Sequence, residues 1–284
     1  MPILPVDLHQ HSTYSDGTST PAQLVDRAAS MALTAMALTD HDTTAGLDEC
    51  ARLAAEAGIP FIPGVEFEAS EGPHLLGYFG GSRGPGVADA AGCYRSFRSS
   101  GVEAMIEQLR AIGYALDPAT IVRRAGAGTP HVGHIVAEMF ELGHLSSQDR
   151  TNAEFARFFG PRGPAPIPDL TAIEWPAVRL VQMLRESGAV VVLAHPSKNH
   201  LPLWPAMVEA GLQGVEAYNR NAHVSGEVAD FINLAEQHRL IVTGGWDFHG
   251  DAQINRIANS DLATFAPPDE ILGPLLDLIA AVAA

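Results

Sequence analysis

Histidine, aspartate and glutamate residues recur in short clusters along this 284-residue chain. His9 and His11 are two residues apart, and Asp247 and His249 repeat that spacing near the other end. Side chains two apart on a strand project from the same side, so each pair can reach one metal ion. The ligand-type residues singled out by position are His9, His11, Asp16, His41, Glu66, His74, His195, Asp247 and His249.

These six histidines, two aspartates and one glutamate are more than one ion can bind. A catalytic ion takes about three or four protein ligands and keeps a position open. The count therefore predicts two or three divalent ions, with a carboxylate as the bridge. Mixed imidazole and carboxylate ligands fit Mn²⁺, Zn²⁺ or Fe²⁺, and oxygen-rich sites that bind phosphate favour Mn²⁺.

Such a centre predicts hydrolysis of a phosphoester. Bridged ions lower the pKa of a shared water, so that a hydroxide is available near neutral pH for in-line attack on phosphorus. The same ions neutralise the phosphoryl oxygens as charge develops. A general acid must then protonate the leaving oxygen, and a water on the ions is one candidate.

Seven short apolar runs carry or precede the ligand-type residues and are predicted to be strands. They are Val6–His11, Ala35–Thr39, Phe61–Glu66, Leu75–Phe79, Val190–His195, Gly214–Tyr218 and Leu240–Gly244. Helical patterns alternate with them, at Pro21–Met31, Leu47–Ala57, Pro176–Ser187 and Ser225–His238. This rhythm is typical of βα units around a parallel sheet and favours a barrel. The ligand-type residues would then meet at the strand ends that form the active-site face of such barrels.

The segment 80–169 has a different pattern. Gly/Pro clusters at Gly80–Gly86 and Gly160–Pro168 mark its boundaries. Between them, the patterns predict helices at Ser100–Ile112, where a Ser-x-x-Glu capping box begins, at His134–Leu142 and at Asn152–Phe159. We therefore expect a barrel of residues 1–79 and 170–284 with a small helical insertion, 80–169. The insertion would cover the substrate and carry Arg123 and Arg124.

The composition limits the partners. Asp and Glu number 33 against 17 Lys and Arg, a formal charge of −16. This balance argues against tracking a long nucleic acid, which needs a basic stripe. The N-terminus resembles no leader, no apolar run is long enough for a bilayer, and Cys50 and Cys93 form no disulfide framework. These features predict a cytoplasmic protein without a membrane partner, and they leave its oligomeric state open.

The ligand-type residues also stand in recognisable motifs. These are His9-Gln10-His11-Ser12, Ser15-Asp16-Gly17, Thr39-Asp40-His41-Asp42-Thr43, Pro63-Gly64-Val65-Glu66, Ala194-His195-Pro196 and Asp247-Phe248-His249. Together they resemble the polymerase and histidinol phosphatase (PHP) family. The resemblance implies an α/β fold, a distorted (β/α)7 barrel, with up to three metals. By position, it implies a first ion on His9, His11, Glu66 and Asp247, a second on Glu66, His74 and His195, and a third on Asp16, His41 and His249.

The chain is similar in particular to a PHP branch encoded near tryptophan genes in some bacteria. Members of that branch carry a helical insertion with an Arg-Gly-His or Arg-Pro-His motif, and act on nucleotide 3′,5′-bisphosphates or 5′-phosphorylated RNA. We place the motif at Val132-Gly133-His134, where the arginine is missing. A second departure is Trp246, where relatives often have serine; its indole could stack on a base or pack in the barrel.

The resemblance gives roles to further residues. Glu66, Asp247 and His134 are expected to be catalytic, His134 as a general acid or phosphate ligand, unless it lies on a helix surface. Lys198, Asn219, Arg220, His223 and Trp246 are the expected substrate contacts, although Lys198 could equally be a solvated loop residue. The remaining histidines, His131, His144, His200 and His238, are interpreted as surface or structural.

The expected activity is removal of the 3′-phosphate from a nucleotide 3′,5′-bisphosphate, with action on short 5′-phosphorylated RNA as an extension. Two alternatives remain open at this point. One is histidinol-phosphate phosphatase, which shares the barrel and the metals. The other is a metal-stabilised accessory module without activity, although such modules usually lose ligands and here all nine positions are filled.

Overall fold

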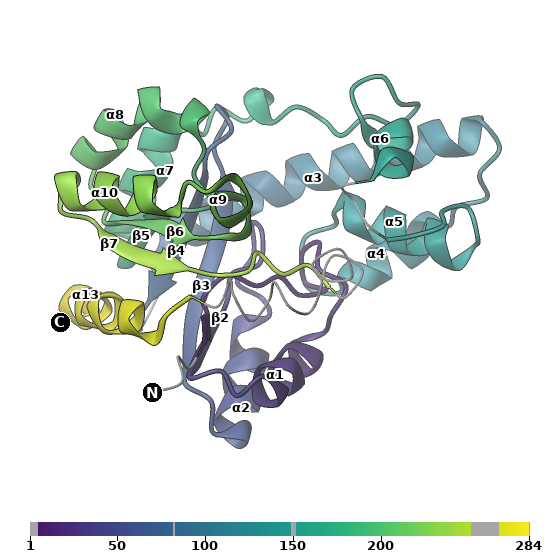
Figure 1. The fold of residues 1–284 in the computed structure, drawn as a ribbon. Helices are drawn as coiled ribbons and strands as arrows, with labels where there is room; N and C mark the ends of the chain where they lie inside the picture. The colour runs from purple at the N-terminus through teal and green to yellow at the C-terminus, as the bar shows by residue number, and fades with distance from the viewer. Residues whose placement is uncertain (1–4, 82, 149–151, 251–266, 284) are drawn as a thin grey trace.

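A computed structural model describes residues 5–81, 83–148, 152–250 and 267–283 (Figure 1). Its centre is one sheet with the strand order β1-β2-β3-β4-β5-β6-β7. The strands are β1 (Val6–Asp7), β2 (Ala35–Leu38), β3 (Phe61–Glu68), β4 (His74–Phe79), β5 (Ala189–Leu193), β6 (Gly214–Tyr218) and β7 (Ile241–Gly244). All seven predicted strands are therefore present. The expectation that the N-terminus resembles no leader concerns Met1–Leu4 in part, and these residues lie outside the described ones.

The sheet curls into a nearly closed barrel, which confirms the predicted fold class. Its two ends meet where Leu8 N donates to Gly244 O at 3.2 Å and His11 N donates to Phe248 O at 2.9 Å. Strand β1 is shorter than predicted and ends at Asp7, so His9 and His11 lie just beyond it. These backbone bonds still hold both histidines in the barrel wall.

The expectation of a wholly parallel sheet is wrong for one strand. Strand β4 is antiparallel to both β3 and β5, whereas the other neighbouring pairs are parallel. The short turn between Glu68 and His74 lets β3 and β4 form a hairpin, and these two residues are paired in register. Because β4 runs in reverse, its first residue, His74, lies at the same barrel end as the last residues of the other strands.

Helices surround the barrel, as Figure 1 shows. They are α1 (Pro21–Ser30), α2 (Leu47–Ala57), α7 (Ala177–Glu186), α8 (Trp204–Glu209), α9 (Arg220–Ser225), α10 (Val228–His238) and α13 (Leu272–Ala283). Helix α1 begins with a capping box of Thr20 and Gln23. The helix predicted at Ser225–His238 begins later, as α10 at Val228, because Ser225 ends the preceding helix α9 and Gly226 adopts a left-handed conformation.

The segment between β4 and α7 is helical, in α3 (Pro85–Ala111), α4 (Pro118–Ala125), α5 (Val132–Glu141) and α6 (Ala153–Phe159). The helix predicted to begin at Ser100 is wrong at its start. Helix α3 begins at Pro85 and runs through Ser100 for 27 residues, so the Ser-x-x-Glu pattern caps nothing. The Gly/Pro cluster that marks the boundary also supplies Gly84 and Pro85, which start this helix.

Two separate apolar cores follow from this arrangement. The barrel cores include Val87, Ala90 and Tyr94 from the first half of α3, and Leu275 and Ile279 of α13 join the residues inside the barrel. The second half of α3 packs with α4, α5 and α6 in a core of its own, through Val102, Met105 and Leu109. Helix α3 thus links the barrel to the insertion, while the boundaries proposed at 79/80 and 169/170 stay a prediction. No helix in the described residues is long and apolar enough to cross a membrane.

Candidate metal centre

The nine ligand-type residues all come together at one end of the barrel. His9, His11 and Asp16 follow β1, His41 follows β2, Glu66 lies in β3, His74 begins β4, His195 follows β5, and Asp247 and His249 follow β7. All nine belong to groups in which one ligand atom from each residue lies within 4.8 Å of the others. Strand ends therefore do the positioning that the sequence predicts.

Glu66 is at the centre of this cluster and is fully buried. Its Oε1 lies 2.9 Å from His74 Nδ1 and 3.1 Å from His195 Nε2. Its Oε2 lies 3.1 Å from His9 Nε2, 3.2 Å from His11 Nε2 and 3.2 Å from His41 Nδ1. One carboxylate in contact with five imidazoles is the arrangement expected of a bridging ligand.

The spacing of these atoms fits metal ions. Two ligand atoms that are each about 2.1 Å from one ion lie about 3.0–3.4 Å apart, depending on the angle between them. The contacts of Glu66 fall in or near this range, and His11 Nε2 is also 3.2 Å from Asp247 Oδ1. Among the described residues, His9 Nε2, His11 Nε2 and Glu66 Oε2 are buried without a hydrogen-bond partner. Buried polar atoms of this kind need a partner, and a cation supplies one.

Geometry divides the residues into three groups. They are His11, Asp16, His41 and His249; His9, Glu66, His195 and Asp247; and His41, Glu66 and His74. The sets implied by the family resemblance place His11, His41 and His195 differently. Glu66 belongs to two groups in both divisions, and His41 belongs to two groups in the geometric one. The structure therefore supports several ions, while the exact ligand sets stay a prediction.

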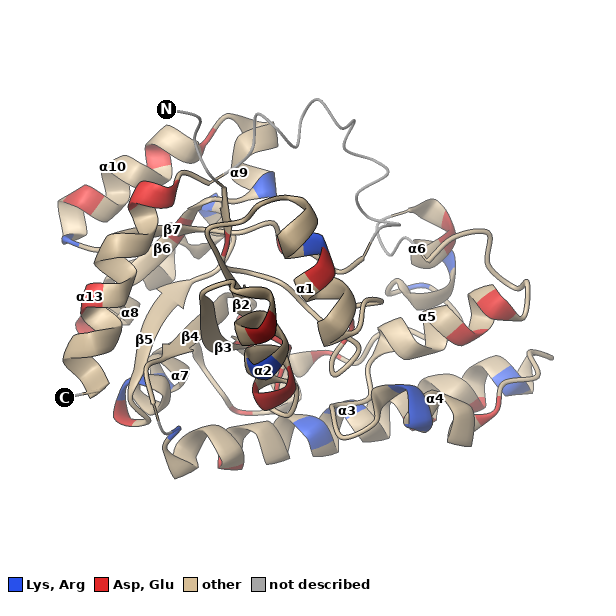
Figure 2. Ribbon diagram, turned by 90° about the horizontal axis from the view of Figure 1, so that it is seen from below, with Lys and Arg blue, Asp and Glu red and all other residues tan. Residues whose placement is uncertain are grey.

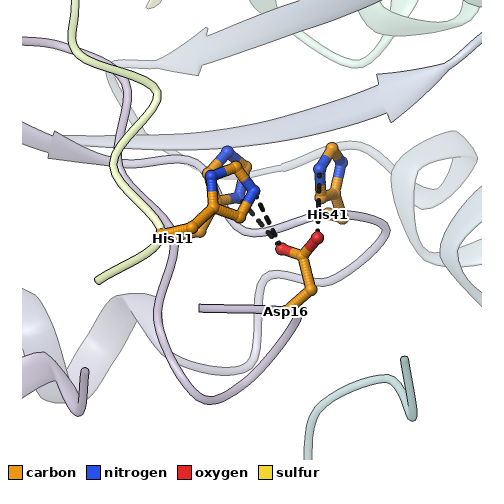
Figure 3. Close-up of side chains that lie close together, drawn as sticks. His11, Asp16 and His41 are labelled. Carbon is orange, nitrogen blue, oxygen red and sulfur yellow. Dashed lines mark ion pairs between the residues drawn. The ribbon is translucent and has the colours of Figure 1, made fainter. Parts of the chain in front are cut away.

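Asp16 lies in the loop after β1, and Figure 3 shows it facing His11 and His41. Its carboxylate is 3.9 Å from His11 Nδ1, 3.8 Å from His41 Nε2 and 3.2 Å from His249 Nε2. Buried Asp40 holds this loop, because its carboxylate accepts hydrogen bonds from Ser12 N, Ser12 Oγ and Ser15 Oγ, each at 2.7 Å. The Thr39–Thr43 motif thus positions both a ligand and the loop opposite it.

The cluster also perturbs its own protonation. Burial would raise the pKa of Glu66, yet His41 and His9 hold that pKa well below its usual range. Burial would lower the pKa of His74, but the Glu66 carboxylate raises it to about 10. Burial would also lower the pKa of His11, but the carboxylates of Asp247 and Glu66 raise it to about 9. The carboxylates are therefore ionised at neutral pH and ready to bind cations.

Two further buried carboxylates support the ligands from behind. Glu216 in β6 lies 3.0 Å from His9 Nδ1 and accepts a 2.8 Å hydrogen bond from His195 N. Asp7 accepts a hydrogen bond from Trp246 N at 3.0 Å and pairs with Arg27 at 3.2 Å. Carboxylates at such positions orient ligands and raise their basicity.

A pocket of about 410 Å³ opens over the ligand-type residues. Its floor includes Asp16, His41, His74, His195, Asp247 and His249. Its other wall comes mainly from the insertion and is largely apolar, with Phe97, Val102, Met105, Val132, Val136, Ile167 and Pro168. This pocket combines a polar floor with an apolar wall, as small-molecule sites do.

Two polar residues of the insertion enter the pocket. Arg98 of α3 lies between two carboxylates, with Nε 3.1 Å from Asp42 Oδ2 and Nη2 3.1 Å from Glu68 Oε2. His131, just before α5, lies 3.9 Å from both Asp16 Oδ2 and Asp42 Oδ2 and stacks on His41. His131 is therefore not a surface residue, because it is buried beside the ligand-type residues.

His134 lies elsewhere. Its Nδ1 accepts a hydrogen bond from His131 N at 2.9 Å, and its Nε2 is 3.2 Å from Thr13 O. Burial lowers the pKa of His134 to about 4. With both ring nitrogens bonded to the backbone, this side chain is a buried link between α5 and the loop after β1. It is not on a helix surface, and its predicted role as an acid stays a prediction that this conformation does not favour.

The predicted substrate contacts are mostly engaged with the protein. Lys198 is exposed and pairs with Glu227 at 2.7 Å, and Asn219 caps α9 through Ala222 N. Arg220 and Trp246 border a small hollow beside His195, but Trp246 is 7% exposed and packs against Phe248 and the Arg27 guanidinium. Packing is thus the interpretation of Trp246 that the structure supports. None of Lys198, Asn219, Arg220 and His223 is among the residues that line the main pocket.

Sequence signals for the missed residues differ in strength. Pro130-His131 carries the Pro-His pair of the Arg-Pro-His form of the motif, so placing the motif at Thr129-Pro130-His131 would have found His131. Glu216 is a charged residue inside an otherwise apolar strand, which is a weaker signal. Arg98 lies in a helix with other arginines, and nothing in its sequence surroundings distinguishes it.

Comparison with known proteins agrees with this site. The model of the PHP domain matches residues 7–149. The chain belongs to the PHP family and is a metal-dependent phosphoesterase of that family. A crystal structure of a protein from Bifidobacterium adolescentis superposes with a TM-score of 0.80 at 25% identity, covering 98% of this chain and 97% of the other.

Three curated relatives have named activities. A phosphoribosyl 1,2-cyclic phosphate 1,2-diphosphodiesterase from Eggerthella lenta is 31% identical over 86% of this chain and 94% of its own length. A 3′,5′-nucleoside bisphosphate phosphatase from Chromobacterium violaceum is 30% identical over 88% and 89%. The 5′-3′ exoribonuclease Rnm of Escherichia coli is 31% identical over 86% and 84%. These relatives share phosphoester hydrolysis but differ in substrate.

Proposed function

We propose that this phosphoesterase removes the 3′-phosphate from a small nucleotide 3′,5′-bisphosphate, using two or three divalent ions, Mn²⁺ foremost. The observation that carries the proposal is the Glu66 carboxylate in contact with five histidines at the floor of a pocket of nucleotide size. Bound ions would activate a water for attack on phosphorus and offset the charge of the phosphoryl oxygens.

The side chains of the chain itself have distinct tasks in this proposal. Glu66 and Asp247 supply the negative charge that holds cations beside one another, because both carboxyl pKa values lie well below their usual range. His131 faces the pocket next to Asp16 and is placed to give a proton to the leaving oxygen. His134, favoured by the sequence, would have to break its contact with Thr13 to do so.

The pocket walls support a small substrate with a flat apolar part. Phe97, Met105 and Val136 offer a surface on which a nucleobase can pack, opposite the ligand-type residues. Arg98 lines this pocket, and its guanidinium offers a positive charge to a second phosphate. In the view of Figure 2, basic and acidic positions are interspersed along the helices and form no continuous basic stripe, which fits a small molecule better than a long strand.

A second candidate is trimming of short 5′-phosphorylated RNA. It is supported by the similarity to the exoribonuclease Rnm over most of both chains. In either case the substrates are intracellular, and the free thiols of Cys50 and Cys93 suit a reducing cytoplasm. Histidinol phosphate remains the alternative substrate among small molecules.

The test compares substrates on one enzyme preparation at a fixed Mn²⁺ concentration. The panel contains adenosine 3′,5′-bisphosphate, adenosine 3′-monophosphate, histidinol phosphate and a 5′-phosphorylated oligoribonucleotide. We expect the highest kcat/KM for the bisphosphate, with release of one phosphate. Equal kcat/KM for the bisphosphate and the monophosphate would contradict a site for a second phosphate. A preference for the oligoribonucleotide or for histidinol phosphate would establish the corresponding alternative instead.

A further inference from the structure

We propose that Glu216 is a positioning residue for the metal centre: it fixes the tautomer of His9 and the backbone of His195, so that both imidazoles present Nε2 to the same ion. The inference rests on the proposed metal centre. It concerns a residue that would not touch an ion itself, and it predicts that one carboxylate controls two ligands from different strands.

The contacts of Glu216 use both of its oxygens. Oε1 lies 3.0 Å from His9 Nδ1, and Oε2 accepts a 2.8 Å hydrogen bond from His195 N. The carboxylate lies inside the barrel and is 0% exposed. His9 follows β1 and His195 follows β5, and their rings stack with centroids 5.7 Å apart. Glu216 therefore connects two ligand-type residues that are 186 positions apart in the chain.

The contact with His9 decides which ring nitrogen is free. An ionised carboxylate can only accept, so Nδ1 of His9 must carry the hydrogen. In the neutral imidazole this leaves the lone pair on Nε2, which is the atom 3.1 Å from Glu66 Oε2. The other tautomer would place a hydrogen on Nε2 and remove His9 as a ligand. Glu216 thus selects the tautomer that can bind a cation.

The contact with His195 stabilises an unusual backbone conformation. His195 has a φ of 25°, a value that side chains with a Cβ rarely adopt. This turn directs its ring toward the site, where Nε2 lies 3.1 Å from Glu66 Oε1. The hydrogen bond from His195 N to Glu216 offsets part of the strain. Without it, the turn could relax and withdraw the ring from Glu66.

The burial of Glu216 argues for a functional reason to keep it. Among the described residues, its ion-pair partner is His9, and neither a lysine nor an arginine pairs with it. A buried carboxylate without a strong cationic partner costs folding free energy. Its neighbours in β6, Val215 and Ala217, face the other side of the strand, where they pack in apolar clusters with α7 and with α9 and α10, respectively.

The decisive variant is Glu216→Gln, which keeps the size but offers one acceptor in place of two. If its oxygen accepts from His195 N, its NH₂ group faces His9 Nδ1 and forces the wrong tautomer; in the opposite orientation, the bond to His195 is lost. Thr243→Val is the matched control, because Thr243 is fully buried on β7 and paired in register with Glu216.

The experiment measures Mn²⁺ binding by titration on wild type and both variants, and melting temperature in the presence of a chelator. We expect Glu216→Gln to bind one of the ions about 10–100-fold more weakly, without a lower melting temperature in chelator, and Thr243→Val to bind like wild type. Unchanged Mn²⁺ affinity in Glu216→Gln would overturn the inference. So would a loss of affinity matched by a lower melting temperature in chelator, because that indicates a merely structural role.

A second measurement covers the case in which Glu216→Gln does not fold. In wild type loaded with Zn²⁺, nitrogen-15 NMR should show the His9 proton on Nδ1; a proton on Nε2 would overturn the inference. Wild type that takes up no metal would contradict the proposed centre itself. Normal uptake by wild type together with normal uptake by Glu216→Gln contradicts only the role of Glu216.

Discussion

The barrel end and the helical insertion contribute different things to the same pocket. At the barrel end, ligand-type side chains are buried, charged or polar, and held by strand ends and by Glu216, Asp7 and Asp40 behind them. The insertion has its own apolar core and presents mainly apolar side chains to the pocket, with Arg98 and His131 as its charged or titratable exceptions.

The proposed chemistry therefore belongs to the barrel end, and the proposed substrate selectivity belongs to the insertion. Substitutions in the barrel should change metal binding and therefore every substrate equally. Substitutions in the insertion should leave the ions in place and alter turnover or substrate affinity. Single substitutions in each part can test this separation of metal binding from substrate selectivity.

Glu66→Gln should abolish most activity, because the bridging carboxylate loses charge and its contact with five histidines. We expect kcat/KM to fall on the order of 10³-fold or more for every substrate, together with the metal content. Glu56→Gln, on the exposed face of α2, is the control and should behave as wild type. Full metal content in Glu66→Gln would show that the bridge lies elsewhere.

His131→Ala and His134→Ala separate the two histidines of the insertion. His131 faces the pocket, so its loss should lower kcat about 100-fold with metal content and melting temperature retained. His134 makes two backbone contacts, so its loss should lower the melting temperature by about 3–8 °C and leave kcat within about threefold. The reverse result, a slow but stable His134→Ala, would restore the acid role that the sequence predicts.

Phe97→Ala tests the apolar wall. Removing the ring takes away contact area for a nucleobase, so we expect KM for the nucleotide to rise about tenfold with kcat nearly unchanged. Phe140→Ala makes the same change at an exposed position of α5 and should have no kinetic effect. An equal loss for histidinol phosphate, which has no nucleobase, would argue against base packing at this wall.

The barrel end should also show itself in the pH dependence of stability. The pKa values of His11 and His74 are about 9 and about 10, above the ordinary value of 6.5. Between pH 6.5 and these values, the two residues therefore bind more protons in the folded protein than in the unfolded chain. In chelator, the contribution of these two histidines to stability is therefore full below about pH 6.5 and is lost toward pH 10, with a fall in melting temperature of roughly 5 °C or more between these pH values. With saturating Mn²⁺ the trend should weaken or reverse, because ions displace these protons. A flat profile in chelator would contradict the shifted pKa values.

The difference between the barrel end and the insertion also explains which features could be predicted from the sequence. His9, His11, Glu66, Asp247 and His249 stand at predicted strand ends, where spacing alone brings side chains to one edge. The direction of β4 could not be read, because an apolar run looks the same in either orientation. Yet His74 still reached the site, since the reversal puts the first residue of that strand at the correct end.

The insertion was harder to predict for a physical reason. Where α3 begins and which of its side chains face the barrel depend on packing between two cores, which local patterns do not encode. Arg98 and His131 therefore escaped the sequence analysis. The substrate contacts expected at Lys198 and Asn219 stay a prediction, and in the structure these two residues form an ion pair and a helix cap.

The metal content of the protein tests the central claim most directly. Chain purified in the presence of Mn²⁺ and then desalted should contain two or three ions per chain by elemental analysis, and removal by chelator should abolish phosphate release that Mn²⁺ restores. The three overlapping groups of ligand-type residues predict this result. A reproducible content of one ion or fewer per active chain would contradict the account.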